Sequence, residues 1–91
     1  MPKKSIAKRP TRPIYVIAEE ILTDIDSGNW SKHAALHAAP YLAAMRKISV
    51  ITDSYLLDRG RDIVRRFLIN ASTWRGETAR RIKHELRSML A

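Results

Sequence analysis

Basic side chains at helical spacing are the residues of this chain best suited to a chemical task. In "NASTWRGETARRIKHELRSML", residues 70–90, Arg80, Lys83 and Arg87 recur three and four positions apart. On a helix they would form one row of about 10 Å, at 1.5 Å per residue, with Arg81 on the opposite flank. Such a row can contact the phosphates of a nucleic acid.

A solvated helix face is the alternative interpretation of this row. Cations near the C-terminal end of a helix are favoured by its dipole, and arginine also covers apolar surface with its stem. Both interpretations stay open for this helix taken alone. The preceding helix adds a second short row, and the start of the last helix adds one more cation. The candidate phosphate-binding residues of this half are Arg61, Arg65, Arg75, Arg80, Lys83 and Arg87.

The N-terminal segment favours the nucleic-acid hypothesis. Residues 1–13 hold five cations, three prolines and no acid, so we expect a disordered basic arm. Residues 14–58 have three cations and six acids, whereas residues 59–91 have nine cations and three acids. A basic arm beside basic helices is a common arrangement in nucleic-acid-binding proteins. The arm residues predicted to contact phosphates are Lys3, Lys4, Lys8, Arg9 and Arg12.

Sequence-specific DNA recognition is a narrower hypothesis. A helix-turn-helix needs two helices joined by a short turn, which residues 69–86 could supply. The second helix would then present Thr73, Arg75, Glu77 and Thr78 at its start. A plain helical hairpin produces the same pattern, and we prefer that interpretation.

Fragments that imitate metal sites do not complete their patterns. Residues 24–29, "DIDSGN", begin like a calcium loop, but Asn29 and Ala35 stand where that loop needs glycine and glutamate. His33 and His37 have helical spacing, yet an alanine replaces the glutamate that zinc proteases carry directly after the first histidine. We therefore expect no bound metal and no cofactor.

Paired carboxylates are the remaining candidates for catalysis. Glu20 with Asp24, and Asp58 with Asp62, are each one helical turn apart. Acid–base work would need burial that separates their pKa values. We expect salt-bridged, solvated surface at both pairs instead. The chain has no cysteine, which excludes thiol chemistry and fits the cytoplasm. We predict a binding protein without catalysis.

Helical periodicity defines the elements that must position these side chains. Apolar residues from Ile14 to Ile25 predict a helix over 14–27 that ends at Gly28. Because proline breaks a regular helix, we divide the next segment into a helix near 32–38 and another from Pro40, with one kinked helix as the alternative. A further helix is predicted from Asp53 to Ala71, and the last from Ser72 or Thr73 to about Leu90.

Gly60 lies in the middle of the apolar face predicted for the third of these regions. Glycine weakens a helix interior by about 1 kcal/mol relative to alanine, so its presence needs a reason. Close approach of a neighbouring helix is our first explanation, and a helix that starts only near residue 58 is the second. In a regular helix, Tyr55 and Ile69 would point outward, which makes them candidates for a partner interface.

These elements predict an all-α fold. We expect a compact bundle of four or five helices over residues 14–91, preceded by the basic arm at residues 1–13. No apolar run is long enough to span a bilayer, so we expect no membrane partner. Because so small a domain buries little apolar surface, a homodimer could add to its stability. The predicted core contains Ile17, Ile21, Ile25, Leu42, Met45, Val64, Phe67, Trp74, Ile82 and Leu86.

Several segments within residues 40–87 resemble a known group of proteins. "PYLAAM", an aspartate closely followed by Tyr55, and above all "NASTWRGETARRIK" resemble short uncharacterised proteins encoded by phages, prophages and plasmids. The resemblance implies a source in mobile genetic elements rather than an activity. It adds a second hypothesis, because small phage proteins often block a host defence or regulatory protein, as anti-CRISPR proteins do. The partner would then be a host protein instead of a nucleic acid.

Overall fold

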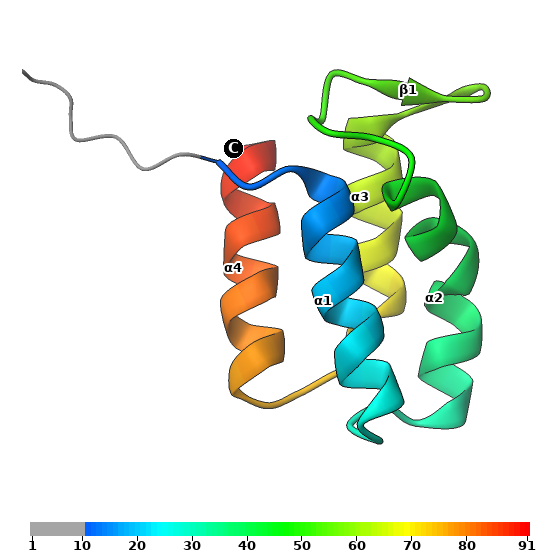
Figure 1. Ribbon diagram of the computed structural model, residues 1–91, viewed down its shortest axis with the longest axis vertical. Coiled ribbons are helices and arrows are strands. Elements are labelled where there is room, and N and C mark those ends of the chain that lie inside the picture. The colour runs from blue at the N-terminus through cyan, green and yellow to red at the C-terminus, as the bar shows by residue number, and fades with distance from the viewer. Residues whose placement is uncertain (1–10) are drawn as a thin grey trace, which may run out of the picture.

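The computed structural model describes residues 11–91 and places four helices side by side, each antiparallel to the one before it (Figure 1). They are α1 (Ile14–Asp26), α2 (Lys32–Met45), α3 (Gly60–Asn70) and α4 (Glu77–Leu90). A short antiparallel hairpin, β1 (Ser54–Tyr55) with β2 (Asp58–Arg59), precedes α3. The predicted helical bundle is confirmed for these residues, with the hairpin as an unpredicted addition.

One apolar core joins the helices. Each predicted core residue is buried except Ile25, which is partly exposed at the edge of the core. An aromatic cluster closes the end of the bundle where α4 begins: the rings of Trp30 and Trp74 stack with centroids 4.8 Å apart, and Phe67 meets Trp74 edge-on at 6.3 Å. Aromatic pairs in such offset and edge-on geometries add to the free energy of burial. This cluster fixes the loop that leads into α4.

The segment around Pro40 is one helix, so the predicted division into two is wrong and the alternative of a single helix is correct. α2 continues from Lys32 to Met45 through Pro40, with Ser31 accepting a hydrogen bond from the Ala34 N–H at its start. Pro40 and Leu36 both face solvent. Water can therefore hydrate the Leu36 carbonyl that the proline leaves without a partner, which makes the interruption tolerable.

α3 begins at Gly60, so the predicted helix from Asp53 is wrong and the late start was the better alternative. The Asp53 carboxylate accepts hydrogen bonds from the Ser49 and Val50 N–H groups, at 2.8 and 3.1 Å, and so closes a loop. A Cβ on Gly60 would lie 2.9 Å from the Ile51 carbonyl oxygen and 3.0 Å from that of Val50. The glycine therefore permits close approach of loop backbone, where a neighbouring helix was expected.

The last helix also starts later than predicted. α4 begins at Glu77, and residues 71–76 form a loop that ends at Gly76, whose φ of 112° suits glycine alone among ordinary residues. Thr73 and Arg75 thus precede the helix instead of lining its first turn. α3 and α4 are consecutive antiparallel helices in contact with each other, as in a helical hairpin. A recognition helix that opens with Thr73 and Arg75 is therefore excluded.

Residues 11–13 differ from the disordered arm predicted for residues 1–13. Arg12 lies against α4, in ion pairs with Glu20 and Glu85, and the Pro13 carbonyl accepts the first hydrogen bonds of α1. The predicted arm therefore stays a prediction only for residues 1–10, which lie outside the described part of the chain. Its cations Lys3, Lys4, Lys8 and Arg9 belong to that segment.

Candidate functional site

A groove on one flank of α4 gathers most of the predicted phosphate-binding residues of the folded domain. Its volume is about 470 Å³. We call it the cation groove. It is lined by Ser72, Trp74, Arg75, Gly76, Ala79, Arg80, Lys83 and Arg87. Helical spacing brings the last three cations to one flank, as predicted, and the loop adds Arg75 from a different direction.

Lys83 is the central cation of this groove. Its Nζ donates a hydrogen bond to the Trp74 carbonyl oxygen at 2.7 Å and lies 5.9 Å from the centroid of the Trp74 ring. Because Trp74 is only 2% exposed, the amine is held at a fixed point on the wall of the groove. Burial, and then the charges of Arg87 and Arg75, lower the pKa of Lys83 below its ordinary value.

The charge of the groove is uncompensated. No carboxylate lines it, and within residues 11–91 none of its four cations forms an ion pair. Several acids of the described chain are paired elsewhere, for example Glu19 with Arg46 and Asp62 with Arg65. Four like charges around one cavity create a strong local positive potential that favours an anion.

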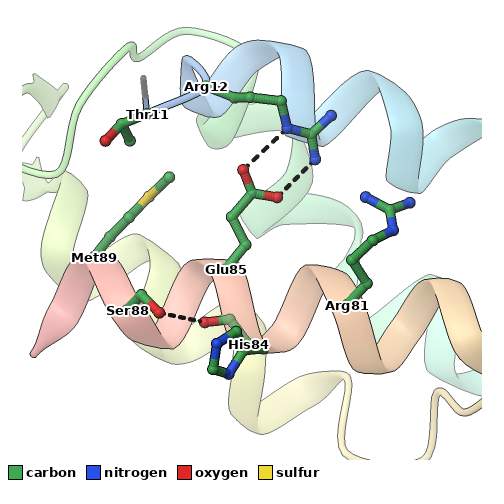
Figure 2. Close-up of a pocket in the computed structure, with 7 residues that line it drawn as sticks. All are labelled: Thr11, Arg12, Arg81, His84, Glu85, Ser88 and Met89. Carbon is green, nitrogen blue, oxygen red and sulfur yellow. Dashed lines mark hydrogen bonds and ion pairs between the residues drawn. The ribbon is translucent and has the colours of Figure 1, made fainter. Parts of the chain in front are cut away.

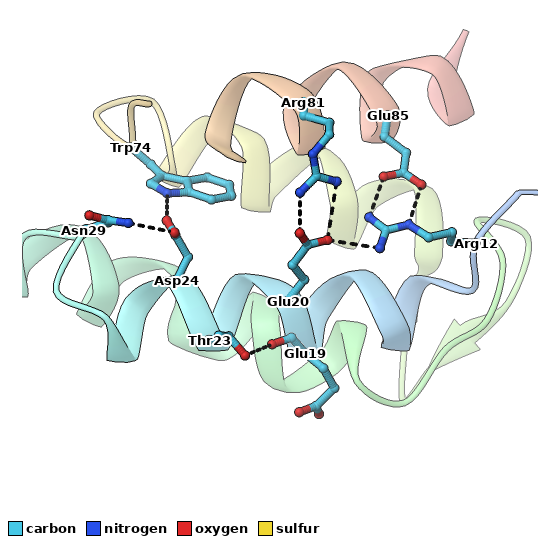
Figure 3. Close-up of polar contacts among 9 residues, drawn as sticks. All are labelled: Arg12, Glu19, Glu20, Thr23, Asp24, Asn29, Trp74, Arg81 and Glu85. Atoms are coloured by element: carbon cyan, nitrogen blue, oxygen red, sulfur yellow. Dashed lines mark hydrogen bonds and ion pairs between the residues drawn. The ribbon is translucent and has the colours of Figure 1, made fainter. Parts of the chain in front are cut away.

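The opposite flank of α4 faces α1 and is neutralised (Figure 3). Glu20 of α1 is paired with both Arg81 and Arg12, and Arg12 reaches on to Glu85 with a nitrogen–oxygen distance of 2.7 Å. The hydrogen bond from Arg81 lowers the pKa of Glu20, burial raises it, and Arg12 lowers it further. The pKa of Glu20 therefore lies below its ordinary value. We call these four side chains the charged seam. They hold α4 against α1.

A buried hydrogen bond extends this contact beyond the charged seam. The Trp74 indole N–H donates to Asp24 at 2.7 Å, and the Asn29 amide donates to the other oxygen of the same carboxylate at 2.8 Å (Figure 3). Asp24 is only 9% exposed. The solvated position predicted for Asp24 is therefore wrong, because a tryptophan far along the chain needs its oxygen. Glu20 does lie in a salt bridge, as predicted.

A second pocket, of about 520 Å³, lies where residues 11–12 meet α4 (Figure 2). Its lining includes Arg12, Arg81, His84 and Glu85. Glu85 accepts two hydrogen bonds from Arg12 inside it, and Arg81 is committed to Glu20. Its arginines are thus neutralised by carboxylates, so this pocket attracts an anion much less than the cation groove does.

Three predicted phosphate-binding residues of the described chain lie apart from the cation groove. Arg61 donates a hydrogen bond to the Leu90 carbonyl oxygen at 3.0 Å, at the C-terminal end of α4. Arg65 has its guanidinium 3.7 Å from Asp62. Arg12 belongs to the charged seam. The predicted row of Arg61 and Arg65 therefore does not continue the row on α4.

The predicted partner interface has a different form in the structure. Ile69 is 70% exposed, as expected, but Tyr55 is half-buried in β1 and packs against the core. The most exposed apolar side chains are instead Leu56 and Leu57 at the tip of the hairpin, 81% and 100% exposed. Leu56 has a φ of 58°. No Asn-Gly or similar turn signature marks this tip, so the hairpin could not be recognised from the residue types.

Two further findings concern the described residues alone. His33 and His37 do share a helical face, with ring centroids 6.1 Å apart, but residues 11–91 contain no cluster of three side chains able to hold a metal ion. None of the described helices combines the length and hydropathy needed to cross a bilayer. Comparisons with models of protein families, with curated proteins and with solved structures found no match.

Proposed function

We propose that this protein binds nucleic acid through phosphate contacts made by the cation groove, without catalysis. One observation carries the proposal: four cations line a single cavity with no carboxylate, and within residues 11–91 none of the four forms an ion pair. The helix dipole favours Arg87 in the last turn of α4, but it disfavours Arg75 and Arg80 near the start of the helix. A phosphate backbone would supply the missing anions.

The N-terminal segment extends this proposal. Residues 1–10 carry Lys3, Lys4, Lys8 and Arg9 and join the domain at Thr11, which lines the pocket beside α4. We include these four cations in the proposed interface, as further contacts to the phosphates of a bound strand. A cytoplasmic location and an origin in a phage or another mobile element are parts of the same proposal, consistent with the resemblance of residues 40–87.

The test is a titration with random duplex DNA, single-stranded DNA and RNA at two salt concentrations. We expect micromolar affinity that falls with salt by about 0.7–0.9 of a power per phosphate contacted. Arg80→Ala with Arg87→Ala should weaken binding to all sequences alike. Arg65→Ala, which removes a charge outside the groove, is the matched control and should change affinity little. Absence of binding at low salt would refute the proposal.

A second candidate function is inhibition of a host protein, in the manner of anti-CRISPR proteins. The hairpin tip favours it. Leu56 adopts a left-handed conformation that costs a residue with a side chain about 1 kcal/mol, and Leu57 is fully exposed beside it. An exposed apolar tip of this kind suits an apolar cleft on a larger protein.

The two functions respond to different substitutions. Leu56→Gly with Leu57→Asn would give the turn ordinary turn residues, so it should preserve or raise stability. If inhibition of a host protein is the function, these changes abolish capture of one defined host protein while the groove variants keep it. If nucleic-acid binding is the function, the hairpin variant keeps full affinity for DNA and RNA.

A further inference from the structure

The cations of the groove do not all lie in one row. Arg80, Lys83 and Arg87 follow one another on α4, but Arg75 approaches from the loop before the helix. Both Arg75 and Arg87 are near enough to Lys83 for their charges to lower its pKa. A protein that follows a phosphate backbone needs its cations spread along the strand. This cluster is better matched to one compact anion.

The charge of the cluster exceeds that of an internal phosphate. A phosphodiester carries one negative charge, whereas a phosphomonoester carries about −1.5 to −2 at pH 7 and offers three acceptor oxygens. Four uncompensated cations, with an amine already partly desolvated at their centre, gain more from the second kind of anion. Arginine can also bind two oxygens of one phosphate at once.

The backbone of the groove allows a phosphate to approach closely. Its lining includes the small residues Gly76 and Ala79, and a Cβ built on Gly76 would meet nothing within 4 Å. Gly76 is also the N-cap of α4 and makes no side-chain capping bond. The first N–H groups of the helix lack intrahelical acceptors and can add hydrogen bonds to those of the cations.

We propose that the cation groove binds the terminal phosphate of a nucleic-acid strand, a phosphomonoester, in preference to the internal phosphodiesters. Lys83 contacts the phosphate at the centre, and Arg75, Arg80 and Arg87 enclose it. The remaining volume of the groove accepts the first nucleotide. This inference rests on the proposed function, because it assumes that the anion belongs to a nucleic acid. It makes the protein one that recognises strand ends.

The test compares single strands of one sequence that differ only in a 5′-phosphate, a 3′-phosphate or two hydroxyl ends. Fluorescence anisotropy with a label on an internal base measures each Kd with the full-length chain. We expect at least one phosphorylated end to bind tenfold or more tightly than the hydroxyl strand. Equal affinity of all three strands would overturn this inference and leave the proposed function intact. Failure of all three to bind at low salt would refute both.

Variants connect the preference to the groove. Arg75→Ala removes an exposed loop cation without touching the core, so the protein should stay folded while the preference falls at least fivefold. Lys83→Gln should abolish the preference, with a circular dichroism spectrum as the check on folding. Arg65→Ala removes the same charge outside the groove and should keep the preference. If Arg65→Ala lowers it as much as Arg75→Ala does, general charge explains the effect and the inference is wrong.

Two competitors separate other sources of the same chemical group. Inorganic phosphate should displace the phosphorylated strand only at concentrations at least a hundredfold above the Kd of the strand. Comparable affinity for inorganic phosphate would show a site for free phosphate and overturn the assignment to strand ends. A phosphoserine peptide of equal net charge should also bind more weakly than the strand. Tighter binding of the peptide would assign the groove to a phosphoprotein and overturn the inference in the same way.

Discussion

The two flanks of α4 carry similar side chains in opposite electrostatic situations. On the flank that faces α1, Arg81 is paired with Glu20, and Glu85 receives two hydrogen bonds from Arg12. On the other flank, Arg80 and Arg87 share the cation groove with Lys83 and with no carboxylate. Arg80 and Arg81 are neighbours in sequence, so position along the helix does not explain the difference. The direction in which each side chain points decides it.

The two flanks therefore differ in role: the cations of one stabilise the fold through ion pairs, and those of the other have no carboxylate partner within residues 11–91 and are available to bind an anion. The charged seam supports the contact between α1 and α4, together with the Trp74–Asp24 hydrogen bond. The cation groove does the reverse, since burial, together with repulsion from Arg87 and Arg75, lowers the pKa of Lys83 and opposes folding. Sequences commonly accept such a local cost at sites of function. Changes on the two flanks should therefore affect different properties.

Truncation of a buried apolar side chain between the two flanks of α4 should cause the largest loss of stability. Leu86 is fully buried on α4. Leu86→Ala leaves a cavity and should lower the free energy of unfolding by about 2–5 kcal/mol, enough to unfold much of so small a domain. Both flanks would then fail together. Urea denaturation followed by circular dichroism measures the change, and a loss below about 1 kcal/mol would mean that α4 contributes little to the core.

Removal of the buried hydrogen bond beside the charged seam should come next. Asp24→Ala leaves the Trp74 indole N–H without its acceptor in a site only 2% exposed. An unpaired buried donor costs about 1–3 kcal/mol. The same denaturation experiment applies, with Asp26→Ala on the exposed side of α1 as the control that should change stability by less than about 0.5 kcal/mol. Equal effects of the two variants would contradict the role assigned to Asp24.

The helices and the core could be predicted because both follow from periodicity. The repeat from Ile14 to Ile25 defines α1 within one residue, and the apolar face of the last helix identifies Ile82 and Leu86. Helix starts were less predictable, since loop contacts distant in sequence set them. Gly60 could be singled out as requiring a reason, but the carbonyl oxygens that crowd it come from a loop with no distinctive pattern.

Only part of the candidate site, the cations on α4, could be predicted from the sequence. Helical spacing alone is enough to join Arg80, Lys83 and Arg87 in one row. Spacing does not show that Arg61 is committed to the Leu90 carbonyl oxygen, or that Arg12 reaches Glu20 and Glu85. These partners lie far away in the chain. The cations of α4 could therefore be identified from the sequence, whereas their freedom from carboxylates is a property of the folded chain.

The charged seam makes stability depend on pH. Arg81, and then Arg12, hold the pKa of Glu20 below its ordinary value of 4.5. A lowered pKa in the folded state gives stability that is present above the unfolded pKa and is lost as the pH falls through the folded one. Glu20→Gln should cost about 0.5–1 kcal/mol at pH 7, because the ion pairs are half-exposed. The difference from the wild type should shrink as the pH falls below 4.5 and Glu20 takes up its proton. A constant difference in stability from pH 7 to pH 3 would assign the effect to packing.

The adjacent pair Arg80 and Arg81 gives the smallest change in stability and the sharpest comparison. Arg80→Ala removes a cation from the groove, so stability should change by less than about 0.5 kcal/mol. Arg81→Ala removes the same charge from the same helix but leaves Glu20 with one partner fewer, and it should lower stability measurably more. Affinity for nucleic acid should show the opposite order, with the larger loss in Arg80→Ala.

The pKa of Lys83 provides a second, independent measurement of the difference between the two flanks of α4. Arg87 is one of the charges that lower the pKa of Lys83. Arg87→Ala should therefore raise that pKa toward its ordinary value of 10.5, which NMR of the lysine side chain can follow. Arg81→Ala, on the other flank, should leave the Lys83 pKa unchanged. If both variants raise it equally, the repulsion comes from the overall charge of the domain, and the groove has no special electrostatic character.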